Sequence, residues 1–259
     1  MRRSLIREKL ARDEFITIAQ SWIIPHWKLV DLMGHVGFDS VWLEHEHSDF
    51  TIGELGQMIL AARAHDMDSL VRVERSGYTS TLKILEAGAT GIIVPHCMGG
   101  DDAKTIVRDA KYAPLGMRGA GGSVDADYGT KDRTAYFEHA NRDTLVIVII
   151  EDKEAVEDID SIAATEGVDG ILLGPGDLSQ SYGVIGQMDH PLIHEAVTAI
   201  ADACARHGKA WGAPVGSREH AQQLLNQGAR LMQLGNDQTA LVEGFTASRD
   251  SVKNLTPAP

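Results

Sequence analysis

Two apolar stretches decide the fold of this chain, Leu145-Val146-Ile147-Val148-Ile149-Ile150 and Val168-Asp169-Gly170-Ile171-Leu172-Leu173. Glu151 follows the first stretch, and Asp177 follows the second within Gly174-Pro175-Gly176-Asp177-Leu178-Ser179. Continuous apolar runs of this length are typical of parallel strands that are covered on both faces. If the two runs are neighbouring strands, both carboxylates lie at one end of the sheet, where they form a candidate site for a divalent cation. Taken singly, either acid is equally consistent with a helix cap or a first helical turn.

Short apolar runs recur along the chain and alternate with segments of helical period. We expect strands at residues 15–19, 40–44, 69–73, 91–94, 145–150, 170–173, 210–212 and 231–234. We expect helices at residues 51–65, 79–87, 101–110, 153–166, 191–208, 217–228 and 239–253. Eight strand–helix units that close on themselves make a (β/α)8 TIM barrel, the fold class that we predict.

The alternative to a barrel is a doubly wound open sheet. That fold usually carries a glycine-rich phosphate turn after its first strand, but here the turn reads Gln20-Ser21-Trp22-Ile23-Ile24-Pro25. We therefore predict a single barrel domain over residues 1–259. A solvated helix within residues 1–15 precedes it, and a disordered tail at residues 255–259 follows it.

Composition narrows the choice of partners and compartment. The formal net charge is -13, which disfavours nucleic acid and anionic membranes as partners. No apolar run approaches the roughly 20 residues that span a bilayer, and residues 1–15 contain no apolar core of signal-peptide length. The two cysteines, Cys97 and Cys204, have no metal-finger spacing, so we expect a reducing compartment, the cytoplasm.

One long glycine-containing segment, residues 112–141, separates the expected fourth and fifth strands. Its length and position predict a lid over the site or a subunit contact.

Barrel enzymes place their chemistry at the carboxyl ends of the strands. Polar residues expected at those ends are Glu44, His45, Glu46, His47, Arg72, His96, Cys97, Glu151, Asp152, Asp177, Ser179, Asn236 and Asp237. The opposite ends supply Asp68, Asp143, Lys209 and Arg230, which we expect in solvated turns.

Several short motifs occur in order along the chain at separations typical of one family. They are Gly37-Phe38-Asp39 leading to Glu46-His47, Val71-Arg72-Val73, Leu85-Glu86-Ala87-Gly88-Ala89, Gly91-Ile92-Ile93-Val94-Pro95, Tyr112-Ala113-Pro114-Leu115-Gly116-Met117-Arg118-Gly119, Ile150-Glu151-Asp152-Lys153-Glu154-Ala155 and Glu166-Gly167-Val168-Asp169-Gly170 through Gly174–Ser179. From about residue 19 to residue 241 the chain resembles the metal-dependent (class II) pyruvate aldolases, of the 4-hydroxy-2-oxoheptanedioate and 2-dehydro-3-deoxyglucarate aldolase type.

The resemblance implies a metal-dependent lyase that cleaves a 4-hydroxy-2-oxo acid reversibly to pyruvate and an aldehyde. Glu151 and Asp177 match the family's metal ligands, and their hard oxygens suit Mg²⁺, Mn²⁺ or Co²⁺. The bound ion would stabilise the enolate that cleavage produces. Gly176 matches a position whose backbone N–H holds the substrate carboxylate, and Arg72 matches an arginine that stabilises the transition state.

Further site residues follow from the same resemblance. His47 matches the general base, and a carboxylate at Glu86 is implied to raise its basicity. Glu44 is a catalytic candidate beside His47, while Trp22 and Ser179 are substrate-binding candidates. The family also implies a homo-oligomer, a hexamer built as a trimer of dimers that exchange their last helix, here residues 239–253.

The chain departs from the family pattern at several site positions. Glu44 replaces the usual aspartate, and His45 replaces a small residue. Ile149 stands where a substrate-binding glutamine is common, and Glu74 where a proline is typical. Asp125 falls near a position where an arginine often grips an acidic substrate. These changes make the family's usual dicarboxylate product a doubtful substrate.

Other chemistries remain open from the residues. No lysine lies at a strand end where a Schiff base would form, which favours the metal route. His45 and His47 form the His-x-His pair of zinc hydrolases, which His96, Cys97 and Asp237 would complete. Two alternatives remain. One is a lyase that acts on a coenzyme A thioester through the same metal-stabilised enolate, and the other is a barrel that has lost catalysis and serves in binding or assembly.

Overall fold

The computed structural model describes residues 3–253 and residue 255. The tail predicted at residues 255–259 therefore lies almost wholly outside the described residues. The eight strands are β1 (Ile16–Ser21), β2 (Ser40–Glu44), β3 (Asp68–Arg72), β4 (Gly91–Val94), β5 (Leu145–Ile150), β6 (Gly170–Leu173), β7 (Ala210–Pro214) and β8 (Leu231–Asn236). They pair in sequence order, all parallel, and β8 closes onto β1. The predicted (β/α)8 barrel is confirmed.

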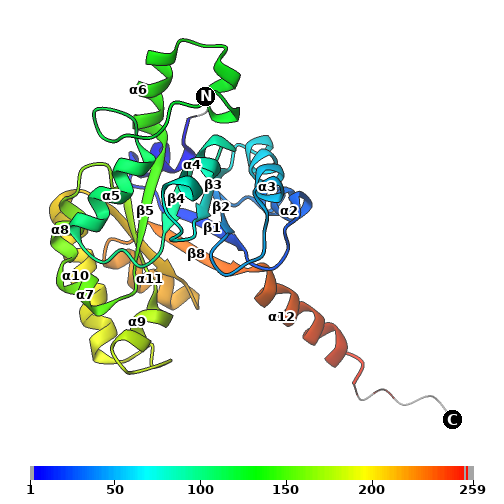
Figure 1. The fold of residues 1–259 in the computed structure, drawn as a ribbon. Helices are drawn as coiled ribbons and strands as arrows, with labels where there is room; N and C mark the ends of the chain where they lie inside the picture. The colour runs from blue at the N-terminus through cyan, green and yellow to red at the C-terminus, as the bar shows by residue number, and fades with distance from the viewer. Residues whose placement is uncertain (1–2, 254, 256–259) are drawn as a thin grey trace.

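The described residues form twelve α-helices, most of which cover the outside of the barrel (Figure 1). They are α1 (Leu5–Leu10), α2 (Trp27–Val36), α3 (Ile52–Ala64), α4 (Tyr78–Glu86), α5 (Gly100–Ala110), α6 (Arg133–Asp143), α7 (Lys153–Glu157), α8 (Ile159–Ala164), α9 (Pro175–Ser181), α10 (Pro191–His207), α11 (Arg218–Asn226) and α12 (Asp237–Asp250), with a 3-10 helix η1 (Val124–Gly129). The helix expected over residues 153–166 is broken at Asp158 into α7 and α8.

Side chains fill the barrel interior and the layer between barrel and helices as two separate cores. Ile18, Trp42, Leu70, Ile93, Ile147, Leu172 and Leu231 belong to the inner core. The alternate strand residues Val41, Val71, Val146 and Ile171 pack outward under the helices. Because successive strand residues point to opposite sides, both faces of the sheet are apolar, and this explains the continuous apolar runs in the sequence.

The segment at residues 112–141 is not a lid over the mouth of its own barrel. It holds η1 and α6, and its two ends are tied by a 2.7 Å hydrogen bond from Tyr112 N to Asn141 Oδ1. Since α5 runs back from the end of β4, the segment begins at the amino-terminal ends of the strands, and α6 lies at that end beside the N-terminus (Figure 1). A subunit contact stays the prediction for this segment.

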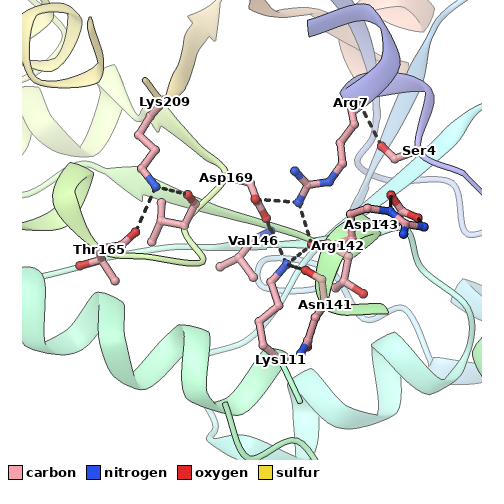
Figure 2. Close-up of polar contacts among 12 residues, drawn as sticks. Ser4, Arg7, Lys111, Asn141, Arg142, Asp143, Val146, Thr165, Asp169 and Lys209 are labelled. Atoms are coloured by element: carbon pink, nitrogen blue, oxygen red, sulfur yellow. Dashed lines mark hydrogen bonds and ion pairs between the residues drawn. The ribbon is translucent and has the colours of Figure 1, made fainter. Parts of the chain in front are cut away.

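The amino-terminal end of the barrel is closed by α1 and a buried polar network (Figure 2). Ile6 of α1 joins the inner core, and Asp68 accepts 2.8 Å hydrogen bonds from Ser4 Oγ and Ile6 N. Asp169 pairs with Arg7 at 2.7 Å and with the buried Lys111 at 3.4 Å. Burial lowers the pKa of Lys111.

The expectation of solvated turns at this end was wrong for two residues. Asp68 is fully buried because α1 covers it. Lys209 donates to the carbonyl oxygens of Thr165 and Val168 at 3.1 and 2.8 Å (Figure 2).

The last helix projects away from the barrel instead of packing on it (Figure 1). The side chains of Leu241, Val242 and Phe245 are exposed on α12. Among the described residues, no helix is long and apolar enough to cross a membrane.

Candidate active site

Arg72 and Glu44 form the centre of the site at the carboxyl ends of β3 and β2. The barrel register places the two residues directly opposite each other. Both side chains are buried, and Arg72 Nε lies 2.8 Å from Glu44 Oε2 and 3.1 Å from Oε1. Arg72 Nη2 lies 2.7 Å from Glu44 Oε2 but makes no well-directed hydrogen bond within the described chain. This nitrogen is a buried donor that a ligand oxygen can satisfy.

Two tryptophan rings hold the guanidinium of Arg72 in place. The guanidinium carbon lies 5.4 Å from the ring centre of Trp22 and 5.3 Å from that of Trp42. Such stacking suits the planar, weakly hydrated guanidinium and not a lysine ammonium. Trp22 therefore lies at the site through its contact with Arg72, and its role in substrate binding stays a prediction.

His47 lies at the mouth of the barrel on the loop after β2. Glu44 Oε1 accepts hydrogen bonds from the backbone N–H groups of Glu46 and His47, at 2.8 and 3.0 Å, and so shapes this loop. The His47 ring is about half exposed, with Nε2 3.6 Å from Glu46 Oε2 and its centre 6.1 Å from that of Trp22. An imidazole in this position is a candidate general base for a substrate at the mouth of the barrel.

Glu151 is the buried acid of the predicted metal pair. Its Oε1 accepts a 2.7 Å hydrogen bond from the backbone N–H of His96, a residue with a positive φ of 48°. Burial raises the pKa of Glu151, and the negative charges of Asp177 and Glu46 raise it further. A cation beside this group relieves all three effects, so the donor set fits a hard divalent ion.

Gly174 leaves room beside Glu151. A Cβ on Gly174 would lie 2.6 Å from Glu151 Oε2, so a larger residue would displace the carboxylate. Asp177 is exposed in the first turn of α9, one strand over, because β5 and β6 pair with Ile150 opposite Leu173. The structure thus brings the ends of the two strands together as predicted.

Gly176 and Ser179 also lie on α9. The first hydrogen bond of this helix runs from Leu178 N to Gly174 O, so the Gly176 N–H precedes the helical ladder, and open space surrounds its Cα. The Ser179 hydroxyl donates to Gly176 O at 2.7 Å and accepts from Gly186 N at 3.0 Å. Both contacts join Ser179 to backbone groups of α9 and of the segment that follows it. The role of Ser179 in substrate binding therefore stays a prediction.

Glu86 does not reach His47 within one chain. It ends α4, which runs back along β3, so it lies at the amino-terminal end of the barrel, where a Cβ on Gly121 would overlap its carboxylate. His47 follows β2 at the opposite end. Within one chain, Glu86 therefore cannot raise the basicity of His47 by direct contact.

The zinc set of the hydrolase alternative is not assembled. His45 Nε2 pairs with Glu74 at 3.3 Å, and burial raises the pKa of the Cys97 thiol to about 12. Asp237 uses its carboxylate on backbone N–H groups, accepting from Trp22, Ile23 and Ile24 at 2.8, 3.1 and 2.9 Å.

Three further groups at the site had no role in the predicted aldolase mechanism. Glu46 lies 3.2 Å from Arg72 Nε, His96 Nδ1 lies 2.9 Å from Asp152, and Asp237 holds the Trp22 loop. All three follow strands, and for this reason the sequence places them among the polar residues expected at strand ends. Their partners come from other strands and cannot be identified from local sequence.

The acids after β5 and β6, the buried arginine of β3 and the histidine after β2 define a barrel enzyme with its chemistry at the carboxyl ends of the strands. The sequence model of the HpcH/HpaI aldolase/citrate lyase family matches residues 25–244. The chain is 31% identical over 208 residues to the 5-keto-4-deoxy-D-glucarate aldolase of Escherichia coli (strain K12 / DH10B), covering 80% of each chain.

Solved structures agree with this match. An HpcH/HpaI aldolase from Desulfitobacterium hafniense DCB-2 superposes with a TM-score of 0.92 at 28% identity, covering 98% of each chain. The citrate synthase SbnG superposes with a TM-score of 0.86 at 31% identity, covering 95% of this chain and 96% of that one. The protein belongs to the HpcH/HpaI aldolase/citrate lyase family, which confirms the resemblance seen in the sequence. It is a carbon–carbon lyase of the aldolase type.

Proposed function

We propose that this aldolase cleaves a 4-hydroxy-2-oxo acid reversibly to pyruvate and an aldehyde, with Glu151 and Asp177 as the ligands of a divalent cation. The observation that carries the proposal is the pair of acids that follow the neighbouring strands β5 and β6, one of them buried with a raised pKa. Their hard oxygens favour Mg²⁺, Mn²⁺ or Co²⁺ over softer metals. When bound, the cation supplies Lewis-acid stabilisation to the enolate formed by cleavage.

The substrate carboxylate has a candidate partner in the N–H of Gly176, which is free of the helical ladder. Arg72 faces the developing oxyanion, because its buried Nη2 has an unused hydrogen-bonding direction and its ring contacts prevent it from moving away. Glu44 positions both Arg72 and the loop of His47.

His47 takes the proton from the C4 hydroxyl as the C3–C4 bond breaks. The bonding electrons pass to the pyruvate enolate, and C4 leaves as the aldehyde. A proton delivered to C3 then gives pyruvate. In the opposite direction the same groups return the proton to the new hydroxyl, so condensation is accessible.

The aldehyde half is a polar fragment. The E. coli relative carries the name of a keto-deoxy-glucarate aldolase. His45 and Glu74, at 3.3 Å on neighbouring strand ends, offer polar groups at the same mouth. The coenzyme A thioester alternative has no comparable feature in its favour.

Replacing His47 by Ala tests the proposal. We expect pyruvate release from a 4-hydroxy-2-oxo acid, followed by a lactate dehydrogenase coupled assay, to fall about 10²- to 10⁴-fold. Binding of Mn²⁺ should remain, since His47 is not among the proposed ligands. His194→Ala, an exposed histidine on α10, is the matched control. Unchanged turnover in His47→Ala would refute the role of His47 as base.

We further propose that the protein is a homohexamer, a trimer of dimers that exchange α12. Support comes from the exposed apolar residues of this helix and from its projection away from the barrel (Figure 1). A partner subunit that covered α12 would remove this apolar surface from water.

A further inference from the structure

A second cluster of metal-ligating side chains lies on the outside of the barrel, between α2 and α3. Asp31 and His35 are one turn apart on α2, and His65 is the residue that ends α3. His65 Nε2 lies 2.7 Å from Asp31 Oδ1, and His35 Nε2 lies 3.9 Å from Asp31 Oδ2. One ligand atom from each of the three residues falls within 4.8 Å of the others.

The backbone makes room for this cluster. A Cβ on Gly34 would lie 2.7 Å from both Cβ and Cδ2 of His65, so only glycine admits the imidazole there. The His35 ring then stands edge-on to the His65 ring, with the ring centres 4.7 Å apart and an interplanar angle of 71°. A glycine in the last turns of α2 lowers the stability of the helix. At this position it leaves the space in which the imidazole of His65 packs.

We propose that Asp31, His35 and His65 bind a zinc-type ion, Zn²⁺, Ni²⁺ or Cu²⁺, at a site separate from the catalytic one. Two imidazole nitrogens and one carboxylate oxygen are the donors that such borderline ions prefer, whereas Mg²⁺ and Ca²⁺ prefer oxygen alone. The donor set therefore differs in kind from the acidic pair Glu151 and Asp177. A water molecule is the natural fourth ligand, because the His35 side chain is 70% exposed.

The three donors need only small movements to close on an ion. In a tetrahedral site with bonds of about 2.0–2.2 Å, the ligand atoms are about 3.3–3.6 Å apart. Asp31 and His65 must separate slightly, and the exposed His35 must swing inward by rotation about its side-chain bonds.

The position of the cluster predicts a structural role. It lies where α2 and α3 end, before β2 and β3 begin, and thus at the end of the barrel away from His47. An ion held there joins two helices whose following strands carry Glu44 and Arg72. It stabilises the fold without contacting substrate.

Zinc titration of the full-length, chelator-treated protein tests this inference. In an Asp177→Asn background, which weakens the proposed catalytic site, we expect calorimetry to show one equivalent of Zn²⁺ with a rise in Tm. Adding His35→Gln should weaken this binding by more than about tenfold and abolish the rise in Tm. With Cu²⁺, the electron paramagnetic resonance spectrum should show coupling to two imidazole nitrogens, and to one after His35→Gln.

His194→Gln is the control, because it removes an exposed histidine from a helix outside the cluster. His35→Gln alone should leave pyruvate release unchanged, which separates this site from the proposed function. Equal Zn²⁺ affinity and equal Tm rise with and without His35 would overturn the inference and leave Asp31 and His65 as an ordinary ion pair.

Discussion

Arg72 shows what one residue contributes at this site. Its guanidinium is buried against Glu44 and lies over the rings of Trp22 and Trp42. The sequence identified Arg72 as a strand-end cation, and strand pairing explains why Glu44 is its partner. Stacking on Trp22 was not predictable, because it depends on the path of the loop after β1.

Replacing Arg72 by Lys tests this arrangement. An ammonium cannot make the paired contacts of the guanidinium or stack between two rings, so we expect kcat/KM for pyruvate release to fall about 10²- to 10³-fold. Arg75→Lys is the matched control, since Arg75 pairs with Asp102 at 2.9 Å on the exposed rim. Near-normal activity in Arg72→Lys would show that charge alone suffices.

At the scale of elements, the strands were predictable and several helices were not. All eight strands lie within two residues of the expected positions, because burial on both faces leaves a continuous apolar signal. Three α-helices were not among those expected: α2 with Gly34 inside it, α6 with few buried residues, and the short α9. Their stability comes from packing on neighbouring elements, which local pattern does not record.

The start of α12 is joined to the loop after β1 through Asp237. Its buried carboxylate accepts hydrogen bonds from the N–H groups of Trp22, Ile23 and Ile24. We expect Asp237→Asn to lower the free energy of unfolding by about 1.5–3 kcal/mol, since the amide supplies one acceptor atom where the carboxylate supplies two. Urea unfolding measures the change, and KM should rise as Trp22 moves.

Asp250→Asn, at the far end of α12, is the control for Asp237→Asn, because the Asp250 side chain bonds only its neighbour Arg249 among the described contacts. A stable Asp237→Asn protein with unchanged KM would show that the Trp22 loop needs no such anchor.

At the scale of the whole molecule, barrel closure decides which predicted residues meet. Closure brings Glu44, Arg72, Glu151 and Asp177 to one end, as the positions of the strand ends predicted. The same closure separates Glu86 from His47, because α4 returns to the other end before β4 begins. The family motifs specify the order of residues along the chain. The topology of the barrel decides at which of its two ends a helix terminus lies.

The exposed α12 predicts an assembly in solution. Phe245 is 71% exposed on this helix, and a charge there should oppose burial against another subunit. We expect Phe245→Asp to reduce the mass measured by light scattering below that of the wild type. Ile185→Asp, equally exposed at 71% in the loop after α9, should not. A monomeric wild-type protein would contradict the proposed hexamer.

The most direct test of the central claim is pyruvate release after metal removal and return. The chelated wild-type enzyme should be inactive and regain turnover with Mn²⁺ or Mg²⁺. In our proposal Glu151 and Asp177 only hold the ion, and the ion stabilises the enolate. Asp177→Asn should stay inactive at the same Mn²⁺ concentration, while Asp189→Asn, on an exposed loop, should recover fully. Full turnover by protein shown by elemental analysis to be free of metal would contradict the account.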